Sequence, residues 1–123
     1  MTFRTLAPVL QTDDMDRSVR FYTEVLGFTG GMQSADYSNL YRDTVRIMLA
    51  SRDAREEGSP PTFTGQIYLG LDTPEEVDVE WARIKDKAKI IYPVDDFSYG
   101  AREFGIHDDS GYHIAIGAPS RKA

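Results

Sequence analysis

The sequence predicts an α+β domain of two tandem βαβββ modules, whose curved sheets surround a cavity. Three observations support this fold class. Short runs of alternating apolar residues, typical of strands, are interrupted by helical spacing once in each half of the chain. Capping residues precede each helical stretch. The 123 residues suit one domain, and the same order of elements occurs twice, which indicates an internal duplication.

The first half begins with a predicted strand over residues 5–12, which Pro8 restricts to an edge or irregular position. Asp13 and Asp14 favour a helix start, because a short carboxylate accepts hydrogen bonds from the first backbone N–H groups. Gly27 predicts the helix end, since glycine tolerates left-handed dihedral angles. The apolar positions of this helix are Val19, Phe21, Tyr22, Val25 and Leu26. The strands expected after it span residues 28–33, 37–41 and 45–50.

The second half repeats this plan. A strand is expected over residues 66–71, followed by Thr73-Pro74-Glu75-Glu76, a capping box with proline at the first helical position. Val77, Trp81 and Ile84 then recur at helical spacing and predict an apolar stripe. We interpret Trp81 as a packing residue, and Tyr22 likewise in the first helix. A strand over residues 90–94 precedes the C-terminal hairpin.

The C-terminal hairpin has two strands around an Asp-Asp-Ser-Gly turn. In the last strand, His113 and Ala115 are expected on one face, with Ile114 and Ile116 on the other. In the strand before it, Phe104 and Ile106 belong to the apolar side, which places Glu103 and His107 on the opposite side. The apolar face suits packing against helices. We interpret the mixed face as the lining of a ligand cavity.

The domain organisation follows from the segment between the two halves. Residues 51–63 are rich in proline, glycine and charge, which is typical of a linker. We therefore expect a single domain over residues 1–123, with module one at about 3–50 and module two at 64–119. This linker is also the candidate hinge of a domain-swapped or intertwined homodimer.

Composition excludes several classes of function. The net charge is −6 and no basic cluster is present, which argues against a nucleic-acid partner. Without cysteine, disulfides, thiolate catalysis and thiolate metal sites are excluded. No apolar run has the length of a signal peptide or of a membrane span of about 20 residues. We expect a cytoplasmic protein without a membrane partner.

Two segments carry a resemblance to a known family. Residues 14–28 contain an aspartate, Arg17-Ser18, Phe21-Tyr22 and Leu26-Gly27-Phe28 in order. The tail contains Tyr99-Gly100, Arg102-Glu103-Phe104 and an Asp-x-x-Gly turn. These runs resemble the vicinal oxygen chelate superfamily, which includes glyoxalase I, extradiol dioxygenases and bleomycin-resistance proteins. The tail is most similar to the metal-free bleomycin-resistance branch, in which paired chains bind an antibiotic without changing it.

The resemblance also implies where a metal site would lie. Metal-dependent members place His, Gln or Glu on the first and last strands of each module, and the positions that match are Ala7, Met48, Gln66 and Ala115. Alanine has no donor atom, the methionine thioether suits soft copper(I), and a lone glutamine is a weak ligand. His107, His113 and Glu103 are an alternative set of metal ligands, but no metal-binding spacing supports it. We therefore expect no metal and no cofactor.

The remaining side chains predict the ligand. The inward face and the mouth of the cavity combine aromatic rings, amides and charges, which suit a planar aromatic or cationic compound. No nucleophile–base pair is present at motif spacing, so no catalytic residue is assigned. Tyr37 is a further ring expected at the mouth. The predicted ligand-binding residues are Gln11, Tyr41, Arg46, Met48, Phe63, Gln66, Tyr68, Tyr92, Phe97, Tyr99, Glu103 and His113.

These observations favour a homodimeric binding protein over an enzyme. The expected function is sequestration of a bulky aromatic or cationic cytotoxic natural product, in antibiotic resistance or self-protection. One alternative is a metal-dependent lyase, isomerase or dioxygenase of the same fold. The other is a regulatory module whose concave face is closed by a different chain.

Overall fold

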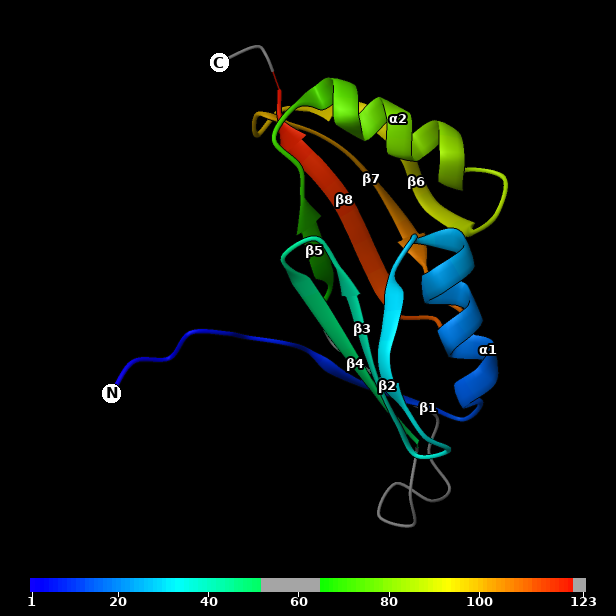
Figure 1. Ribbon diagram of the computed structural model, residues 1–123. Coiled ribbons are helices and arrows are strands. Elements are labelled where there is room, and N and C mark those ends of the chain that lie inside the picture. The colour runs from blue at the N-terminus through cyan, green and yellow to red at the C-terminus, as the bar shows by residue number, and fades with distance from the viewer. Residues whose placement is uncertain (52–64, 121–123) are drawn as a thin grey trace. The chain divides into compact units, whose positions relative to one another are not determined.

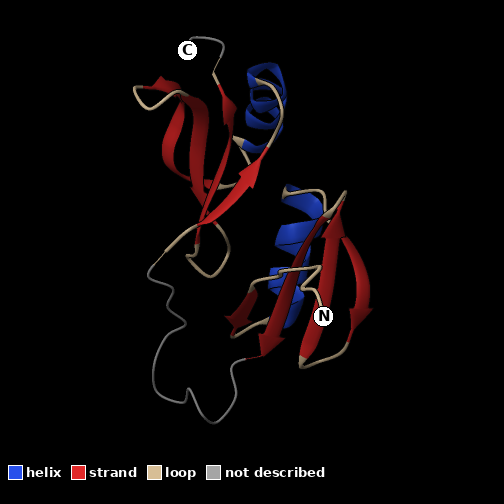
Figure 2. Cartoon of the chain, turned by 90° about the vertical axis from the view of Figure 1, so that its left-hand side faces the viewer, coloured by secondary structure: helices blue, strands red, loops and turns tan. Residues whose placement is uncertain are grey.

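The computed structural model describes residues 1–51 and 65–120 of a chain that divides into two compact units, Met1–Pro61 and Thr62–Ala123. Each unit contains one four-stranded sheet and one helical segment in the order βαβββ. The predicted α+β fold class with tandem modules is confirmed. In each unit the helix lies on one side of its sheet (Figure 2). The predicted linker lies outside the described residues from position 52 onward.

Unit 1 forms a sheet with the strand order β1-β4-β3-β2 (Figure 1). Strand β1 is parallel to β4, and the other neighbours are antiparallel. The elements are β1 (Val9–Thr12), α1 (Met15–Arg20), the π-helical segment η1 (Phe21–Val25), β2 (Thr29–Gln33), β3 (Tyr37–Arg42) and β4 (Val45–Ser51).

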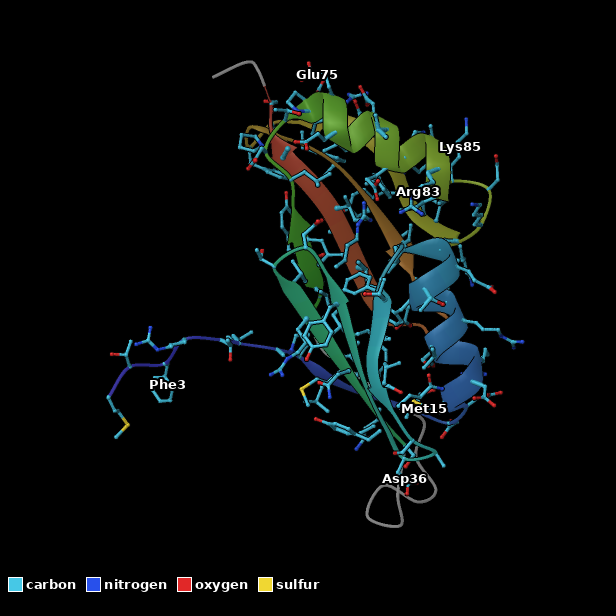
Figure 3. The ribbon with its side chains drawn as sticks, in the orientation of Figure 1. Phe3, Met15, Asp36, Glu75, Arg83 and Lys85 are labelled. Carbon is cyan, nitrogen blue, oxygen red and sulfur yellow. The ribbon has the colours of Figure 1, made fainter. Side chains whose placement is uncertain are left out.

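The first strand and the helix of unit 1 differ from the prediction, whereas the ends of the other three strands agree with it to within one residue. The first strand begins at Val9 rather than residue 5, because Pro8 has no N–H to donate to β4. The Pro8 carbonyl still accepts a hydrogen bond from the Met48 N–H, at 3.0 Å. Phe3, labelled in Figure 3, and Leu6 lie on the preceding segment and are 96% and 89% exposed. The helix also widens into a π-helical turn after Arg20, where the Leu26 N–H bonds to the Phe21 carbonyl at 3.3 Å.

The core of unit 1 lies between its helix and one face of its sheet. Tyr22 is fully buried, as expected for a packing residue, and its ring meets Phe28 edge to face. Leu40 and Ile47 are also fully buried. Met15, at the start of α1 (Figure 3), accepts a hydrogen bond from the Ser38 hydroxyl at 3.4 Å. The opposite face of this sheet receives no helix from its own unit.

Unit 2 repeats the arrangement with the strand order β5-β8-β7-β6 (Figure 1). Its elements are β5 (Ile67–Gly70), α2 (Pro74–Ile84), β6 (Lys89–Phe97), β7 (Ala101–His107) and β8 (His113–Pro119). Strand β6 extends beyond the predicted residues 90–94, and its pairing with β7 changes register twice. In the part of the chain that the structure describes, no helix is long and apolar enough to cross a membrane.

Helix α2 begins with the predicted capping box. The Thr73 side chain accepts from the Glu76 N–H at 3.3 Å, and the Thr73 N–H donates to the Glu76 carboxylate at 3.0 Å. The apolar stripe then packs on the sheet: Val77 and Ile84 are fully buried, and the Trp81 ring meets Phe104 at 5.1 Å between centroids. The helix thus covers the apolar face and leaves the mixed face of the sheet without a helix from its own unit.

Candidate ligand-binding site

The candidate site is the sheet face of unit 2 that points away from α2, which we call the open face. Strand pairing defines it, because directly opposed residues project to the same side. Glu103 is opposite Gly117, Gly105 is opposite Ala115, and His107 is opposite His113. Tyr68 of β5 is opposite Ala115, while Tyr92 and Phe97 of β6 are opposite Gly105 and Ala101. Strand alternation correctly placed Glu103, His107 and His113 on the face opposite Phe104 and Ile106.

Glu103 lies at the centre of the open face and is only 3% exposed. Its Oε2 accepts a hydrogen bond from the Tyr92 hydroxyl at 2.7 Å, and its Oε1 accepts one from the Tyr99 hydroxyl at 2.6 Å. No lysine or arginine of the described residues pairs with this carboxylate. The neighbouring Arg102 points to the other face, where it binds Asp78 at 2.8 Å and Asp96 at 3.4 Å. Glu103 is therefore held by two neutral donors and by no countercharge.

Aromatic rings surround the carboxylate. The ring of Tyr92 meets Phe97 at 5.5 Å and His113 at 5.9 Å, both edge to face. Phe97 also stacks on Tyr99, with centroids 5.6 Å apart and an interplanar angle of 13°. Tyr99 is 68% exposed and Tyr68 is 47% exposed, so part of this aromatic surface is accessible within unit 2. Rings with one polar end suit a ligand that is both flat and polar.

Two strand glycines allow these rings to lie close to the backbone. A Cβ atom at Gly105 would overlap Cε1 of Tyr92 and would lie 2.9 Å from His113 Nε2. A Cβ at Gly117 would overlap the Tyr68 hydroxyl and lie 2.7 Å from Glu103 Cβ. Glycine within a strand commonly marks such a close approach. Gly105 and Gly117 are therefore the floor of the site.

The carboxylate changes the acidity of the surrounding phenols. Burial raises the pKa of Tyr92, and its hydrogen bond to Glu103 raises it further. For Tyr99 the hydrogen bond to Glu103 is the main cause, and the pKa rises from 10.0 to about 12. Burial and the Glu103 charge raise the pKa of Tyr68. Ionising any of these phenols would place a second negative charge beside the carboxylate, so all three are neutral donors at pH 7.

His113 carries a buried ring nitrogen, Nε2, without a hydrogen-bond partner among the described residues. Burial lowers the pKa of His113, the nearby His107 lowers it further, and Glu103 opposes both effects. The imidazole is therefore neutral at pH 7 and presents one unused nitrogen to the open face. His107 lies nearer the hairpin turn, with Nδ1 3.1 Å from the Gly111 carbonyl oxygen.

The corresponding face of unit 1 has a different chemical character. The Tyr37 hydroxyl donates to Met48 Sδ at 3.6 Å, and Tyr41 is opposite Arg46 in the β3–β4 ladder. Asn39, opposite Met48, has a buried Oδ1 without a partner among the described residues. This face therefore combines phenols with a guanidinium, whereas unit 2 combines phenols with a carboxylate.

The structure distributes the predicted ligand-binding residues unevenly. Unit 2 brings six of them onto one face: Tyr68, Tyr92, Phe97, Tyr99, Glu103 and His113. Unit 1 carries Gln11, Tyr41, Arg46 and Met48 on its strands. Gln66 is exposed just before β5, and Phe63 lies outside the described residues.

Sequence reasoning did not single out Asn39, Gly105 or Gly117. For the two glycines a signal was present. Gly105 lies two residues after Glu103 and Gly117 two residues after Ala115, so each glycine is on the predicted ligand-facing side of its strand. Asn39 gave no such signal, because a polar residue in a strand is ordinary on an exposed face.

The positions that would hold a metal in this fold do not fit a divalent cation. In unit 1, Met48 Sδ accepts from a phenol, and Ala7 precedes β1 without a donor atom. In unit 2, Ala115 is fully buried and has no donor, which leaves Gln66 alone. Within residues 1–51 and 65–120, no three His, Asp or Glu side chains gather to hold a metal ion, so His107, His113 and Glu103 do not form such a group.

The chain matches one protein-family model and is similar in fold to several solved structures. The family model described as the Glyoxalase/Bleomycin resistance protein/Dioxygenase superfamily matches residues 5–116. No curated protein matches the chain in sequence. Among solved structures, a glyoxalase/bleomycin resistance protein/dioxygenase from Nocardioides is 20% identical, with a TM-score of 0.77, and the match covers 100% of this chain and 88% of that one.

Two further structures share the fold. The bleomycin-binding protein of Streptomyces verticillus, complexed with copper(II)-bleomycin, is 22% identical with a TM-score of 0.71, over 96% of this chain and 98% of that one. The lactoylglutathione lyase of Agrobacterium tumefaciens is 18% identical with a TM-score of 0.71, over 94% and 92%. At these identities the likeness establishes the fold alone, and the fold accommodates more than one kind of function.

Proposed function

Because the chain belongs to the Glyoxalase/Bleomycin resistance protein/Dioxygenase superfamily, we propose that it is a non-catalytic binding protein for a bulky aromatic or cationic cytotoxic natural product. It sequesters the compound without changing it and acts as a cytoplasmic homodimer in antibiotic resistance or self-protection. The observation that carries this proposal is the buried Glu103 carboxylate, surrounded by aromatic rings and lacking a countercharge.

The charge balance of the open face favours a cationic group. Glu103 as a residue is only 3% exposed, so its carboxylate has lost most of its hydration, and two phenolic donors restore only part of that free energy. A ligand that brings a positive charge to Glu103 supplies the missing countercharge. Arg102 does not do so, because Asp78 and Asp96 hold it on the opposite face.

The surrounding rings favour a flat partner. The rings of Tyr92 and Phe97 are already arranged by their edge-to-face contact, so little conformational entropy is lost when a planar ligand adds to them. A cation beside these rings gains a further attraction from their π-systems. Among the described residues neither histidine hydrogen-bonds to a hydroxyl, which gives no support to a nucleophile activated by histidine.

The comparison with the Streptomyces verticillus protein supports binding as a function available to this fold, since that protein was solved with copper(II)-bleomycin. For the present chain we infer a ligand of the same general kind, large, partly aromatic and carrying a positive charge. Homodimerisation and freedom from a metal cofactor are parts of the same proposal.

Calorimetric titration tests the proposal. The wild-type protein is titrated with bleomycin-type, mitomycin-type and quinoline-bearing peptide antibiotics, beside Glu103→Gln and the control Glu24→Gln, which alters an exposed carboxylate in unit 1. We expect saturable binding of at least one cationic compound, weakened by Glu103→Gln and unaffected by Glu24→Gln. Absence of saturable binding to every compound, together with no protection of cells that express the protein, would contradict the proposal.

One observation favours a second candidate, a metal-dependent lyase, isomerase or dioxygenase of the same fold. The unpartnered Nε2 of His113 is the kind of nitrogen that binds a metal ion. Elemental analysis of protein purified without chelator separates the two candidates. A stoichiometric divalent metal that chelation removes, with loss of a measurable turnover, would establish the enzyme and overturn the binding proposal.

A further inference from the structure

We propose that the Tyr99 side chain is an internal substitute for the ligand, and that it occupies the position where an arylalkyl ammonium compound binds Glu103. This inference rests on the proposed function and deepens it, because it specifies the chemical class that the open face recognises and the group that the ligand must displace.

Tyr99 makes the two contacts that such a ligand would make. Its ring stacks on Phe97 at 5.6 Å with an angle of 13°, and its hydroxyl donates to Glu103 Oε1 at 2.6 Å. A flat ring and a hydrogen-bond donor are thus presented together, to an aromatic face and to a buried carboxylate. A protonated amine in place of the hydroxyl would bring the same donor together with the countercharge that Glu103 lacks.

Tyr99 and Tyr92 differ in how firmly they are held. Tyr92 lies over Gly105 in the middle of β6, between the rings of Phe97 and His113. Tyr99 lies in the turn between β6 and β7 and is 68% exposed. A backbone hydrogen bond that does not involve the Tyr99 side chain holds this turn: the Gly100 N–H donates to the Phe97 carbonyl at 3.0 Å. Displacing the Tyr99 ring therefore leaves the hairpin and the Tyr92 contact intact.

The remaining Tyr92 hydrogen bond restricts the ligand. Since Oε2 of Glu103 stays with the Tyr92 hydroxyl, only Oε1 becomes available. A guanidinium binds a carboxylate best through two parallel bonds to both oxygens, whereas an ammonium acts as a compact charge that needs one. The geometry thus selects a primary or secondary ammonium on a short arm from an aromatic ring.

The experiment uses a matched pair of small probes, benzylammonium and the neutral benzyl alcohol. Their binding to the full chain is measured by chemical-shift titration of the wild type, Tyr99→Phe and Tyr99→Ala. Phe3→Ala is the control, since it removes a ring that is 96% exposed on a segment outside the site. Urea unfolding verifies that each variant is folded.

We expect the affinity for benzylammonium to rise in the order wild type, Tyr99→Phe, Tyr99→Ala. Tyr99→Ala should bind benzylammonium about tenfold more tightly than the wild type, because the internal competitor is removed. The affinity for benzyl alcohol should increase much less in these variants. The double variant Tyr99→Ala, Glu103→Gln should no longer bind benzylammonium more tightly than benzyl alcohol. Phe3→Ala should bind like the wild type.

Equal or weaker binding of benzylammonium by Tyr99→Ala would overturn the inference. The antibiotic titrations keep this outcome separate from the proposed function. If the antibiotics bind the wild type but Tyr99→Ala does not bind benzylammonium more tightly than the wild type, the inference fails and the binding function stands. If Tyr99→Ala binds benzylammonium more tightly than the wild type while no antibiotic binds, the site is as inferred and the sequestering function fails.

Discussion

Gly105 lies directly beneath the ring of Tyr92, at a separation that leaves no room for a Cβ atom, which would stand 2.8 Å from Cζ of that ring. The same missing Cβ would be 2.9 Å from Nε2 of His113. The absence of one methyl group thus allows two side chains of the open face to rest on the sheet.

Replacing Gly105 with alanine should push the Tyr92 ring away from the backbone and break its bond to Glu103. We expect a loss of about 1–3 kcal/mol in the free energy of unfolding, measured by urea denaturation, as for other overpacked interiors. Gly70→Ala is the matched control, because nothing lies within 4 Å of its added Cβ. Similar stability changes in the two variants would show that the Tyr92 ring is not held against Gly105.

The phenols of the site should ionise only at high pH. Ultraviolet titration should find Tyr99 with a pKa of about 12, Tyr92 higher still, and both lowered in Glu103→Gln because the neighbouring charge is gone. A pKa that is higher in the folded than in the unfolded chain favours the folded state below the unfolded value of 10.0. This contribution should be lost as the pH rises from 10.0 towards about 12. Normal phenol titration in the folded protein would contradict the hydrogen bonds to Glu103.

His113 should titrate in the opposite sense. Its pKa is lowered from 6.5, chiefly by burial, so the unfolded chain takes up a proton before the folded chain does. The contribution of His113 to the free energy of unfolding is therefore fully present above pH 6.5 and declines as the pH falls below that value. Proton NMR of the imidazole should give a midpoint below 6.5, and a still lower one in Glu103→Gln, which removes the opposing charge. A midpoint above 6.5 would mean that the ring is solvated or paired.

Helix α2 should depend on its capping box. Thr73→Ala removes the acceptor for the Glu76 N–H and should cost about 0.5–2 kcal/mol in the free energy of unfolding. Thr44→Ala, at an exposed position in the turn between β3 and β4, is the control and should cost much less. A double-mutant cycle with Glu76→Ala should reveal coupling between the two residues, and additive losses would exclude the reciprocal bonds.

Some of these features follow from local chemistry and were predicted for that reason. Gly27 ends the helical segment with φ of 75°, and Gly111 closes the C-terminal turn with φ of 92°. The capping box at Thr73 involves residues three positions apart. Each depends on neighbours in the chain, so the sequence is sufficient to predict it.

Other features were predicted incompletely. Helical spacing placed Tyr22 in the core, but the same apolar pattern suits an α-helix or a π-helical turn, and the segment from Phe21 is π-helical. The strand expected from residue 5 begins at Val9, because a strand exists only where a partner accepts its hydrogen bonds, and the β1 ladder with β4 begins with Val9 opposite Met48. Such boundaries depend on distant residues.

The sequence by itself determined the two modules and, for β7 and β8, which residues share a face, since a strand alternates with a period of two. The contacts of Glu103 required the tertiary structure. Along β6, Ile90 is opposite Ile106 and Tyr92 is opposite Gly105, so two steps on one strand match one on the other. This register shift turns Tyr92 to the open face, where strict alternation from Ile90 would have placed it against α2. Pairing between strands sets such a shift, and that pairing brings the phenol to the carboxylate.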